Sequence, residues 1–330
     1  MSTDNYMYFA PMVAAAICLA LLFMLLRSPS LPQDLPNDRS LHSAPVSRSG
    51  GLAMVFAIAL TGPLFFYGVG TWLSLGGVLA LVSFADDWRS LPFMLRLAAH
   101  VLAAVALLYY QMPDLPLPLA ALLVLAIVWG TNLYNFMDGA DGLAGGMTLI
   151  GFGAYAIAAW AGGNSTNAWF AASVSATAAA FLLLNFHPAR IFMGDVGSIP
   201  LGFLAAAMGV YGWYSATWPA WFPLLTFSPF IVDATFTLAQ RAARGERFWQ
   251  AHREHYYQRL IRMGLGHRNT ALAEYVLMAA AGISALLLLG APAFLQQLAL
   301  AIWAAIYLAL ATMVNKKWAS HMAGKQHDSA

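Results

Sequence analysis

The chain has 330 residues, of which 61% are hydrophobic and only 9% are Asp, Glu, Lys or Arg. Soluble domains carry about 25% charged residues, so this composition excludes a soluble domain, a disordered chain and a nucleic-acid-binding protein. The net charge is only +2, and a single cysteine, Cys18, excludes an intrachain disulfide. Apolar stretches of about 20 residues recur along the chain and predict an all-α, polytopic integral membrane protein.

About eleven membrane spans are expected, in one integral membrane domain over residues 1–330. The first apolar run has no basic residue before it, so we expect it to be retained rather than cleaved as a signal peptide. The spans are expected at Tyr8–Leu26, Gly51–Val69, Thr71–Ala85, Phe93–Gln111, Leu117–Asn135, Leu143–Ala161, Ala168–Phe186, Ile199–Tyr214, Trp218–Gln240, Ala271–Leu289 and Ala291–Val314.

The sixteen basic residues predict the orientation of these spans, because cytoplasmic loops are enriched in Lys and Arg. With the N-terminus outside and the C-terminus cytoplasmic, Arg96 lies at the inner end of the fourth span and every other basic residue falls in an inner segment. These segments are 27–50, 86–92, 136–142, 187–198 and 241–270, which form the expected active-site face, and 315–330, which we expect to be a loose tail.

Five carboxylates from three motifs reach the same inner face. Asp86 and Asp87 end the third span, Asp138 and Asp141 follow the fifth, and Asp195 follows the seventh. A cluster of aspartates suits Mg²⁺ bound together with substrate phosphates, and the nearby Arg190 adds a cation for anionic groups. The alternative is that each aspartate caps a helix or pairs with an arginine in a short loop. Asp233, inside the ninth span near Pro229, is as consistent with a helix bend as with a functional role.

The loop 241–269 is the longest polar segment and contains two histidines three positions apart. On a helix, His252 and His255 would share a face, which suits phosphate binding or proton handling. The alternative is an amphipathic interfacial helix whose arginines face lipid headgroups. The other histidines we singled out lack such a context: His42, His100, His267, His321 and His327. The segment Asn37–Gly51 is open to two interpretations, a phosphate contact or a solvated connector.

Three segments carry a resemblance to a known family. They are Ala85-Asp86-Asp87, then Asn135-Phe136-Met137-Asp138-Gly139-Ala140-Asp141-Gly142-Leu143-Ala144-Gly145-Gly146, then Asn185 with Phe192-Met193-Gly194-Asp195-Val196-Gly197-Ser198. In order, spacing and topology the chain resembles the polyprenyl-phosphate N-acetylhexosamine-1-phosphate transferases. The resemblance implies transfer of an amino-sugar 1-phosphate from a UDP-sugar to undecaprenyl phosphate, with release of UMP, at the cytoplasmic face of a bacterial inner membrane.

The resemblance also implies roles for individual residues. Asp195 would bind Mg²⁺, with Mn²⁺ as the alternative ion, and the other four aspartates would be catalytic. Asp86 and Asp87 would lie beside the lipid phosphate, and Asp138 and Asp141 would shape the nucleotide and metal region. The expected substrate-binding residues are Asn185, Arg190, His252, Arg253, His255 and Arg259. Direct attack and a phospho-aspartate intermediate remain alternatives.

The histidine loop departs from the commoner family pattern, His-x-His-His. Aligning His255 with the first of those histidines puts Tyr257 and Gln258 at the other two. This form resembles the branch that starts O-antigen-type lipopolysaccharide chains rather than the peptidoglycan branch. A different class, a secondary transporter with carboxylate ion-coupling sites, is the competing hypothesis, although such sites usually lie near the bilayer midplane. The identity of the UDP-sugar and a homodimeric state are left open.

Overall fold

The computed structural model describes residues 3–27, 33–34, 46–247, 250 and 252–328. Among these residues, eight helices are long and apolar enough to cross a membrane, judged by length and composition. The prediction of an all-α, polytopic membrane protein is therefore confirmed. The segment Asn37–Gly51, open to a phosphate contact or a solvated connector, falls largely on residues 35–45, outside the described residues.

The helices follow one another with short connections. In the first half of the chain they are the 3-10 helix η1 (Thr3–Phe9), α1 (Ala10–Leu26), α2 (Gly50–Phe65), α3 (Gly70–Arg89), α4 (Phe93–Gln111), α5 (Leu117–Phe136) and α6 (Leu143–Ala161). In the second half they are α7 (Ser165–Asn185), α8 (Asp195–Tyr214), α9 (Trp221–Thr226), α10 (Ser228–Ala243), α11 (Tyr256–Leu260), the π-type turn η2 (Ile261–Leu265), α12 (Gly266–Leu288) and α13 (Ala293–Asp328). Two short antiparallel strands, β1 (Gln33–Asp34) and β2 (Val46–Ser47), lie at one end of the bundle.

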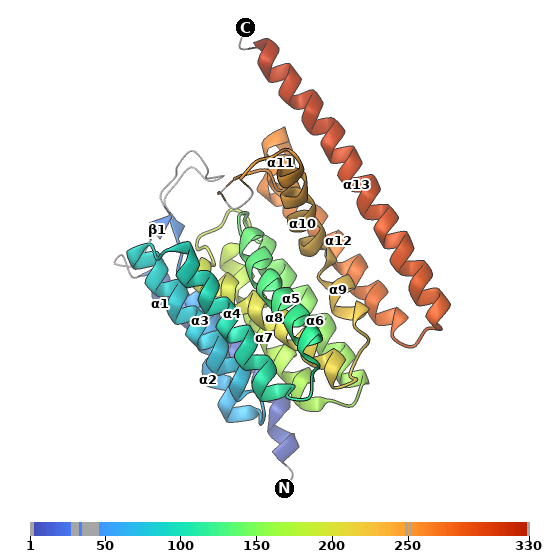
Figure 1. Ribbon diagram of the computed structural model, residues 1–330. Coiled ribbons are helices and arrows are strands. Elements are labelled where there is room, and N and C mark those ends of the chain that lie inside the picture. The colour runs from blue at the N-terminus through green and yellow to red at the C-terminus, as the bar shows by residue number, and fades with distance from the viewer. Residues whose placement is uncertain (1–2, 28–32, 35–45, 248–249, 251, 329–330) are drawn as a thin grey trace.

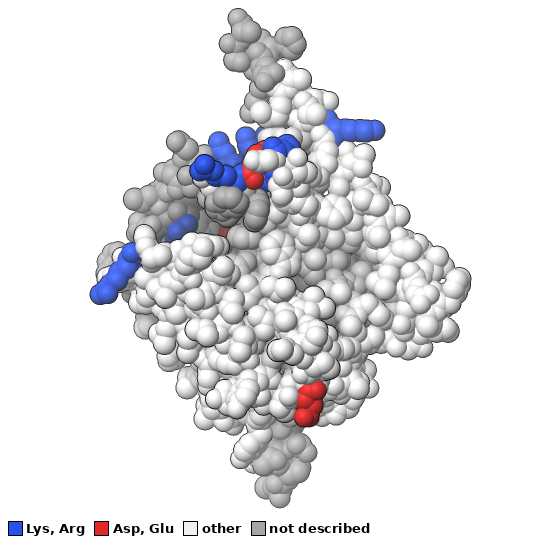
Figure 2. Space-filling model, viewed as in Figure 1, with Lys and Arg blue, Asp and Glu red and all other residues white. Residues whose placement is uncertain are grey.

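Helices α6, α7 and α8 form the most deeply buried part of the bundle. Helix α1 packs on α7, while α3 and α5 pack on α8, so α8 lies between the helix that carries Asp86 and Asp87 and the helix that precedes Asp138. The N- and C-terminal ends of the chain lie at opposite ends of the molecule (Figure 1). Lys and Arg side chains gather at the end that carries α11, and the middle of the visible surface is free of charged side chains (Figure 2). This distribution is the one that a membrane-embedded bundle requires.

Two predicted spans differ from the observed helices. The third span was expected to end at Ala85, but α3 continues through Asp86 and Asp87 to Arg89, so it has 20 residues and is not short. The ninth span is not one helix: it divides at Phe227 into α9 and α10. The proline at position 229 has no backbone N–H to donate, which favours a new helix start at that point.

The tail after Val314 was expected to be loose, and this prediction is wrong. Helix α13 continues to Asp328 without a break and has 36 residues. At 1.5 Å per residue it is about 54 Å long, well beyond the roughly 30 Å of a hydrocarbon core. Figure 1 shows this helix projecting past the bundle at the end that carries α11.

His252 and His255 do not lie on one helix, as the sequence analysis considered. Helix α10 ends at Ala243, and the next helix, α11, begins at Tyr256. His252 therefore lies in an extended segment, and His255 is the N-cap residue of α11. The two rings still come close, with centroids 4.8 Å apart, because the chain turns between them.

Candidate active site

A cavity of about 650 Å³ opens at the end of the bundle that carries the aspartate motifs. Its walls come from α3, α4, α5, α8 and the segment 250–258, so residues far apart in the chain meet there. The polar or titratable residues that line it are Ser83, Asp86, Arg96, His100, Asn132, Asn135, Asp195, Gln250, His252, His255 and Gln258. The rest of the wall is apolar, and this combination suits a ligand with a charged head and a hydrocarbon chain.

Asp195 is the first residue of α8, and the loop before it is held tightly in place. Gly50 and Gly51 donate backbone hydrogen bonds to the carbonyls of Phe192 and Met193, both at 2.9 Å. Gly194 has φ +71°, and a Cβ at this position would collide with the carbonyl of Arg48. The Phe-Met-Gly-Asp motif thus places a carboxylate at a helix N-terminus, where the helix dipole stabilises negative charge.

A second side chain orients this carboxylate. The amide of Asn135, at the end of α5, donates to Asp195 Oδ1 and to Ser198 Oγ, each at 2.9 Å. We had not predicted a role for Asn135, although it begins the second family motif. Its position one residue before the end of α5 makes it a positioning residue for Asp195.

Asp138 and Asp87 are electrostatic neighbours of the Asp195 carboxylate. The Asp138 carboxylate accepts a hydrogen bond from the backbone N–H of Gly194. Burial and the negative charge of Asp195 together raise the pKa of Asp138 well above its ordinary value, against the opposing influence of Arg48. Asp87 is likewise repelled by Asp195 and Asp86 and attracted by Arg48. We call Asp87, Asp138 and Asp195 the acidic cluster.

Asp86 has partners that the acidic cluster lacks. Its Oδ2 forms an ion pair with Arg96 Nη1 at 2.8 Å, and its Oδ1 accepts from the N–H of Leu91 at 2.6 Å. Asp86 therefore stabilises the turn between α3 and α4 while one edge of it faces the cavity. Asp86 thus follows the alternative interpretation, in which an aspartate pairs with an arginine.

Asp141 points to a different group of residues. Its carboxylate contacts His187 Nδ1 at 2.6 Å and His267 Nδ1 at 3.3 Å. It does not line the cavity. His267, which lacked a functional context in the sequence, comes from the start of α12 and joins this group. The two aspartates of the second motif, Asp138 and Asp141, thus serve separate clusters.

Asn185 acts as a brace between loops. Its Oδ1 accepts from Gly142 N at 3.0 Å, and its Nδ2 donates to the carbonyl of Ile191 at 2.9 Å. The side chain is buried and does not line the cavity. Its predicted substrate contact therefore has no support in this geometry, and the structure gives it the role of holding the 136–142 loop against the 187–194 segment. Arg190 is exposed on that segment.

The histidine loop reaches the cavity through two rings. His255 is buried, lines the cavity and stacks between Phe136 and Tyr257. His252 lines the cavity beside it. Burial and the neighbouring His255 and Arg241 lower the pKa of His252 to about 4. Both rings therefore line the cavity, although not through a shared helical face, and their contact with substrate stays a prediction.

Asp233 holds this loop in place. One of its oxygens accepts from the N–H of Tyr256 at 2.9 Å and the other from the N–H of Tyr257 at 3.0 Å, and His255 Nδ1 lies 3.2 Å from the first. These contacts satisfy the open N–H groups at the start of α11. Asp233 is therefore a positioning residue for His255, which resolves the two interpretations considered for it.

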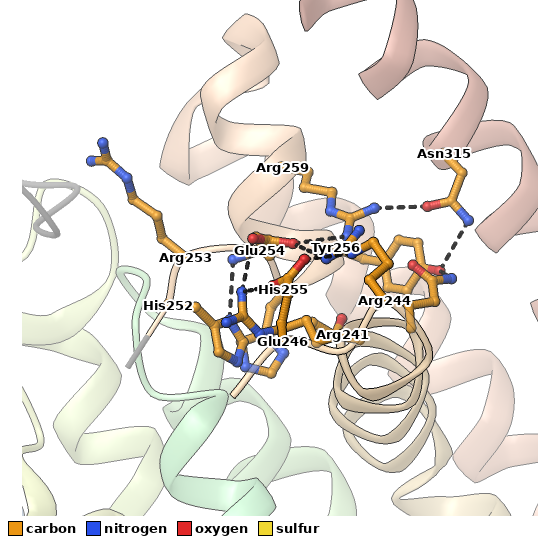
Figure 3. A network of polar contacts seen from close by, with 12 residues as sticks. Arg241, Arg244, Glu246, His252, Arg253, Glu254, His255, Tyr256, Arg259 and Asn315 are labelled. Atoms are coloured by element: carbon orange, nitrogen blue, oxygen red, sulfur yellow. Dashed lines mark hydrogen bonds and ion pairs between the residues drawn. The ribbon is translucent and has the colours of Figure 1, made fainter. Parts of the chain in front are cut away.

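Most of the loop arginines are engaged within the protein. Arg241 and Arg244 pair with Glu246 and Glu254, and Arg259 donates to Asn315 Oδ1 of α13 at 2.7 Å (Figure 3). Arg259 is buried and does not line the cavity, so its predicted substrate contact also lacks support here. In Figure 3 the Arg253 side chain points away from this network.

Comparison with known proteins identifies the class to which this fold and site belong. Residues 69–213 match the sequence profile of glycosyl transferase family 4. The chain is 29% identical over 311 residues, 86% of its length and 87% of the relative's, to a probable undecaprenyl-phosphate N-acetylglucosaminyl 1-phosphate transferase of Bacillus subtilis (strain 168).

Two phospho-N-acetylmuramoyl-pentapeptide-transferases match a shorter region. The protein of Shouchella clausii (strain KSM-K16) is 44% identical over 89 residues, 27% of each chain, and that of Geobacillus thermodenitrificans (strain NG80-2) is 44% identical over 97 residues, 29% of this chain and 30% of the relative. These matches support the polyprenyl-phosphate N-acetylhexosamine-1-phosphate transferase family that the motifs indicated, and a glycosyl-1-phosphate transferase enzyme. This result sets aside the transporter hypothesis.

Proposed function

We propose that the chain transfers an N-acetylated amino-sugar 1-phosphate from a UDP-sugar to undecaprenyl phosphate. An oxygen of the lipid phosphate attacks the β-phosphorus of the UDP-sugar, the bond from that phosphorus to the bridging oxygen breaks, and UMP leaves. The observation that carries the proposal is Asp195, which lines a largely apolar cavity at one end of a membrane bundle and has Asp87 and Asp138 as electrostatic neighbours. The Bacillus subtilis relative, aligned over most of both chains, has a name that describes this chemistry.

The acidic cluster supplies the kind of ligand atom that a divalent cation prefers. Asp195 repels both Asp87 and Asp138, while Arg48 attracts both. Carboxylate oxygens with negative charge are what Mg²⁺ requires, and Mn²⁺ is the alternative. Asp195 would hold the ion, with Asp87 and Asp138 beside it. When bound, such an ion neutralises the charge that develops on the diphosphate and on departing UMP.

The protein's own residues position the two substrates. Phosphoryl transfer depends on alignment and on charge stabilisation more than on covalent chemistry. Asn135 fixes the direction of Asp195, and Asp87, at the end of α3, would orient the lipid phosphate. His252 and His255 donate to phosphate oxygens from the opposite wall. A strong base is unnecessary because a lipid phosphate is already largely anionic at neutral pH.

The proposal includes an orientation in the membrane. We assign about eleven crossings, with the N-terminus outside and the C-terminus and active site on the cytoplasmic side of a bacterial inner membrane. The support is that Lys and Arg gather at the end of the bundle with the cavity loops, as cytoplasmic ends do. UDP-sugars are soluble, so a cavity at that face lets a soluble donor meet a membrane-bound acceptor.

The biological product is proposed to be an O-antigen-type or related envelope glycan. This choice rests on the form of the loop His252-Arg253-Glu254-His255-Tyr256-Tyr257-Gln258-Arg259. The relatives named for peptidoglycan synthesis match less than a third of the chain. A peptidoglycan role is the alternative outcome of the donor screen described next.

The test uses purified protein with undecaprenyl phosphate, Mg²⁺ and one UDP-sugar at a time. UDP-N-acetylglucosamine, its 6-deoxy relatives such as UDP-N-acetylfucosamine, and UDP-N-acetylmuramoyl-pentapeptide are compared by UMP release. Turnover with one of the simple amino sugars, lost on chelation with EDTA and restored by Mg²⁺, is the expected result. Turnover with none of them would overturn the proposed reaction, and turnover with the pentapeptide donor alone would overturn the O-antigen role.

A further inference from the structure

A second cluster of metal-ligating groups lies next to the acidic cluster but does not belong to it. Asp141, His187 and His267 each present one ligand atom, and these atoms all lie within 4.8 Å of one another. They come from three segments: the loop after α5, the loop after α7 and the start of α12. The two imidazole rings are nearly parallel, 17° apart, with centroids separated by 5.7 Å.

The hydrogen-bond pattern at this cluster leaves His267 in conflict. The backbone N–H of Asp141 donates a hydrogen bond to His267 Nδ1 at 3.3 Å, so that nitrogen has to carry a lone pair. The same nitrogen lies 3.3 Å from Asp141 Oδ1, which also presents lone pairs. Two acceptors facing each other repel unless a proton or a cation lies between them. A proton or a cation between Nδ1 and the carboxylate relieves this repulsion, and either takes up the Nδ1 lone pair. A cation also neutralises the carboxylate and can be shared with His187, which contacts the other carboxylate oxygen at 2.6 Å.

We propose that Asp141, His187 and His267 form a binding site for a transition-metal cation of the Zn²⁺ type, separate from the acidic cluster. Imidazole nitrogens select Zn²⁺ and related borderline ions, whereas the all-carboxylate cluster around Asp195 selects Mg²⁺. Bonds of about 2.0–2.2 Å hold ligand atoms roughly 3–4 Å apart. The contact of His267 Nδ1 with Asp141 Oδ1, 3.3 Å, already has that separation, and the contact of His187 Nδ1 with Asp141 Oδ2, 2.6 Å, would lengthen when the ion replaces the hydrogen bond. The remaining separation closes with a shift of less than about 1 Å.

The surroundings of the cluster suit an exchangeable ion. Asp141 is buried and its Oδ2 also accepts from the N–H of Ala189 at 3.2 Å, so the carboxylate is fixed in direction. The His187 side chain is 40% exposed and that of His267 is 13% exposed. Solvent can therefore reach the ion from the His187 side and complete its coordination, as in sites with an open position.

Such an ion would fasten the loops that carry the active site. Asp141 lies three residues after Asp138, and His187 lies eight residues before Asp195. Asn185 already links these two segments through hydrogen bonds. A metal held by Asp141, His187 and His267 would add α12 to this link and stiffen the acidic cluster from outside the cavity.

The test is a metal titration of the full chain, purified without a polyhistidine tag, stripped with chelator and held in excess Mg²⁺ so that the acidic cluster is saturated. Co²⁺ is the probe, because its visible spectrum reports nitrogen ligands, and Zn²⁺ is the competitor. We expect one Co²⁺ per chain that Zn²⁺ displaces. We expect His187→Ala and His267→Ala to weaken binding at least about 100-fold, since loss of an outer-shell partner alone costs 10–100-fold.

Two control variants separate this site from other histidines. His321→Ala, on the C-terminal part of α13, and His252→Gln, beside His255, should bind Co²⁺ like the parent chain. X-ray absorption of the Zn²⁺-loaded parent should show two imidazoles, and this measurement does not depend on any variant folding. Absence of Co²⁺ binding, unchanged binding in His187→Ala or His267→Ala, or a zinc spectrum without imidazole scattering would overturn the site and leave the three residues as a hydrogen-bonded group.

Discussion

Asp87, Asp138 and Asp195 differ from Asp86, Asp141 and Asp233 in what surrounds them, although the two sets share sequence motifs or lie on neighbouring helices. In the first set, Asp195 lines the cavity and repels both Asp87 and Asp138. In the second set, Asp86 has Arg96, Asp141 has two histidines, and Asp233 has two backbone N–H groups and His255. Half-buried carboxylates that repel one another are typical of a functional site, whereas the second set holds neighbouring segments in place.

The largest difference between the two sets is expected in Asp138→Asn. The substitution removes a negative charge from the acidic cluster with little change in size. We expect turnover to fall on the order of 10²–10³-fold, as when other preorganised electrostatic groups are removed. The melting temperature in detergent and without Mg²⁺ should stay the same or rise, because repulsion with Asp195 is relieved. UMP release and a thermal melt of one preparation check both parts, and a large loss of stability would place Asp138 in the paired set.

Asp233→Ala should lose more stability and less turnover than Asp138→Asn. It leaves the N–H groups of Tyr256 and Tyr257 without their acceptor, which costs about 2–3 kcal/mol of stability. Turnover should fall about 10-fold through misplacement of His255. Asp233→Asn, which keeps one acceptor oxygen, should recover part of the melting temperature and of the activity together. Recovery of stability without activity would show that Asp233 acts on more than the position of the loop.

Asp86→Asn tests whether an aspartate that pairs with arginine at the cavity edge belongs to the chemistry. Its partner Arg96 is 39% exposed, so loss of the ion pair should cost only about 1 kcal/mol. We expect turnover to fall about 10-fold or less, against the 10²–10³-fold expected for Asp87→Asn. Steady-state kinetics of these adjacent, matched substitutions decide the question, and equal losses would erase the distinction between the two sets.

The smallest expected effect is the pH dependence of His252. Its pKa falls from 6.5 to about 4 on folding. Between these values the unfolded chain binds more protons than the folded one, so stability increases with pH and is lost on acidification. The ring is partly exposed, so we expect a change of only about 1–2 °C in melting temperature. In His252→Gln the melting temperature should depend less on pH across this range. An unchanged dependence would contradict the assignment of this effect to His252.

Much of the fold was predictable because hydrophobic length alone determines where a helix can cross a membrane. The positions of most helices, including α4 to α8, agree with the predicted spans within a few residues. The division at Phe227 and the extension of α3 to Arg89 were not predictable from apolar runs. The helical tail of α13 was missed because its stabilising contacts, such as Arg259 with Asn315, involve residues 56 positions apart.

The location of the site could be predicted from the sequence, but the role of each residue in it could not. The motifs bring Asp86, Asp195, His252 and His255 to one cavity. Asp141 and Asn185 do not line the cavity because they contact other groups. Asn185 contacts loop backbone atoms, and Asp141 contacts His267, which lies 126 residues later. No local pattern reveals such contacts, and for the same reason His100, a buried residue that lines the cavity, had no context in the sequence.

The central claim is that the bond broken lies between the two phosphates of the donor, and one label tests it. Purified protein is given a UDP-sugar labelled with ³²P at the β-phosphate, undecaprenyl phosphate and Mg²⁺, and the products are partitioned between water and butanol. Our account predicts that the label enters the lipid fraction with one UMP released per lipid product, and that Asp195→Asn abolishes both. Label that stays in water as UDP, while sugar enters the lipid, would contradict the account.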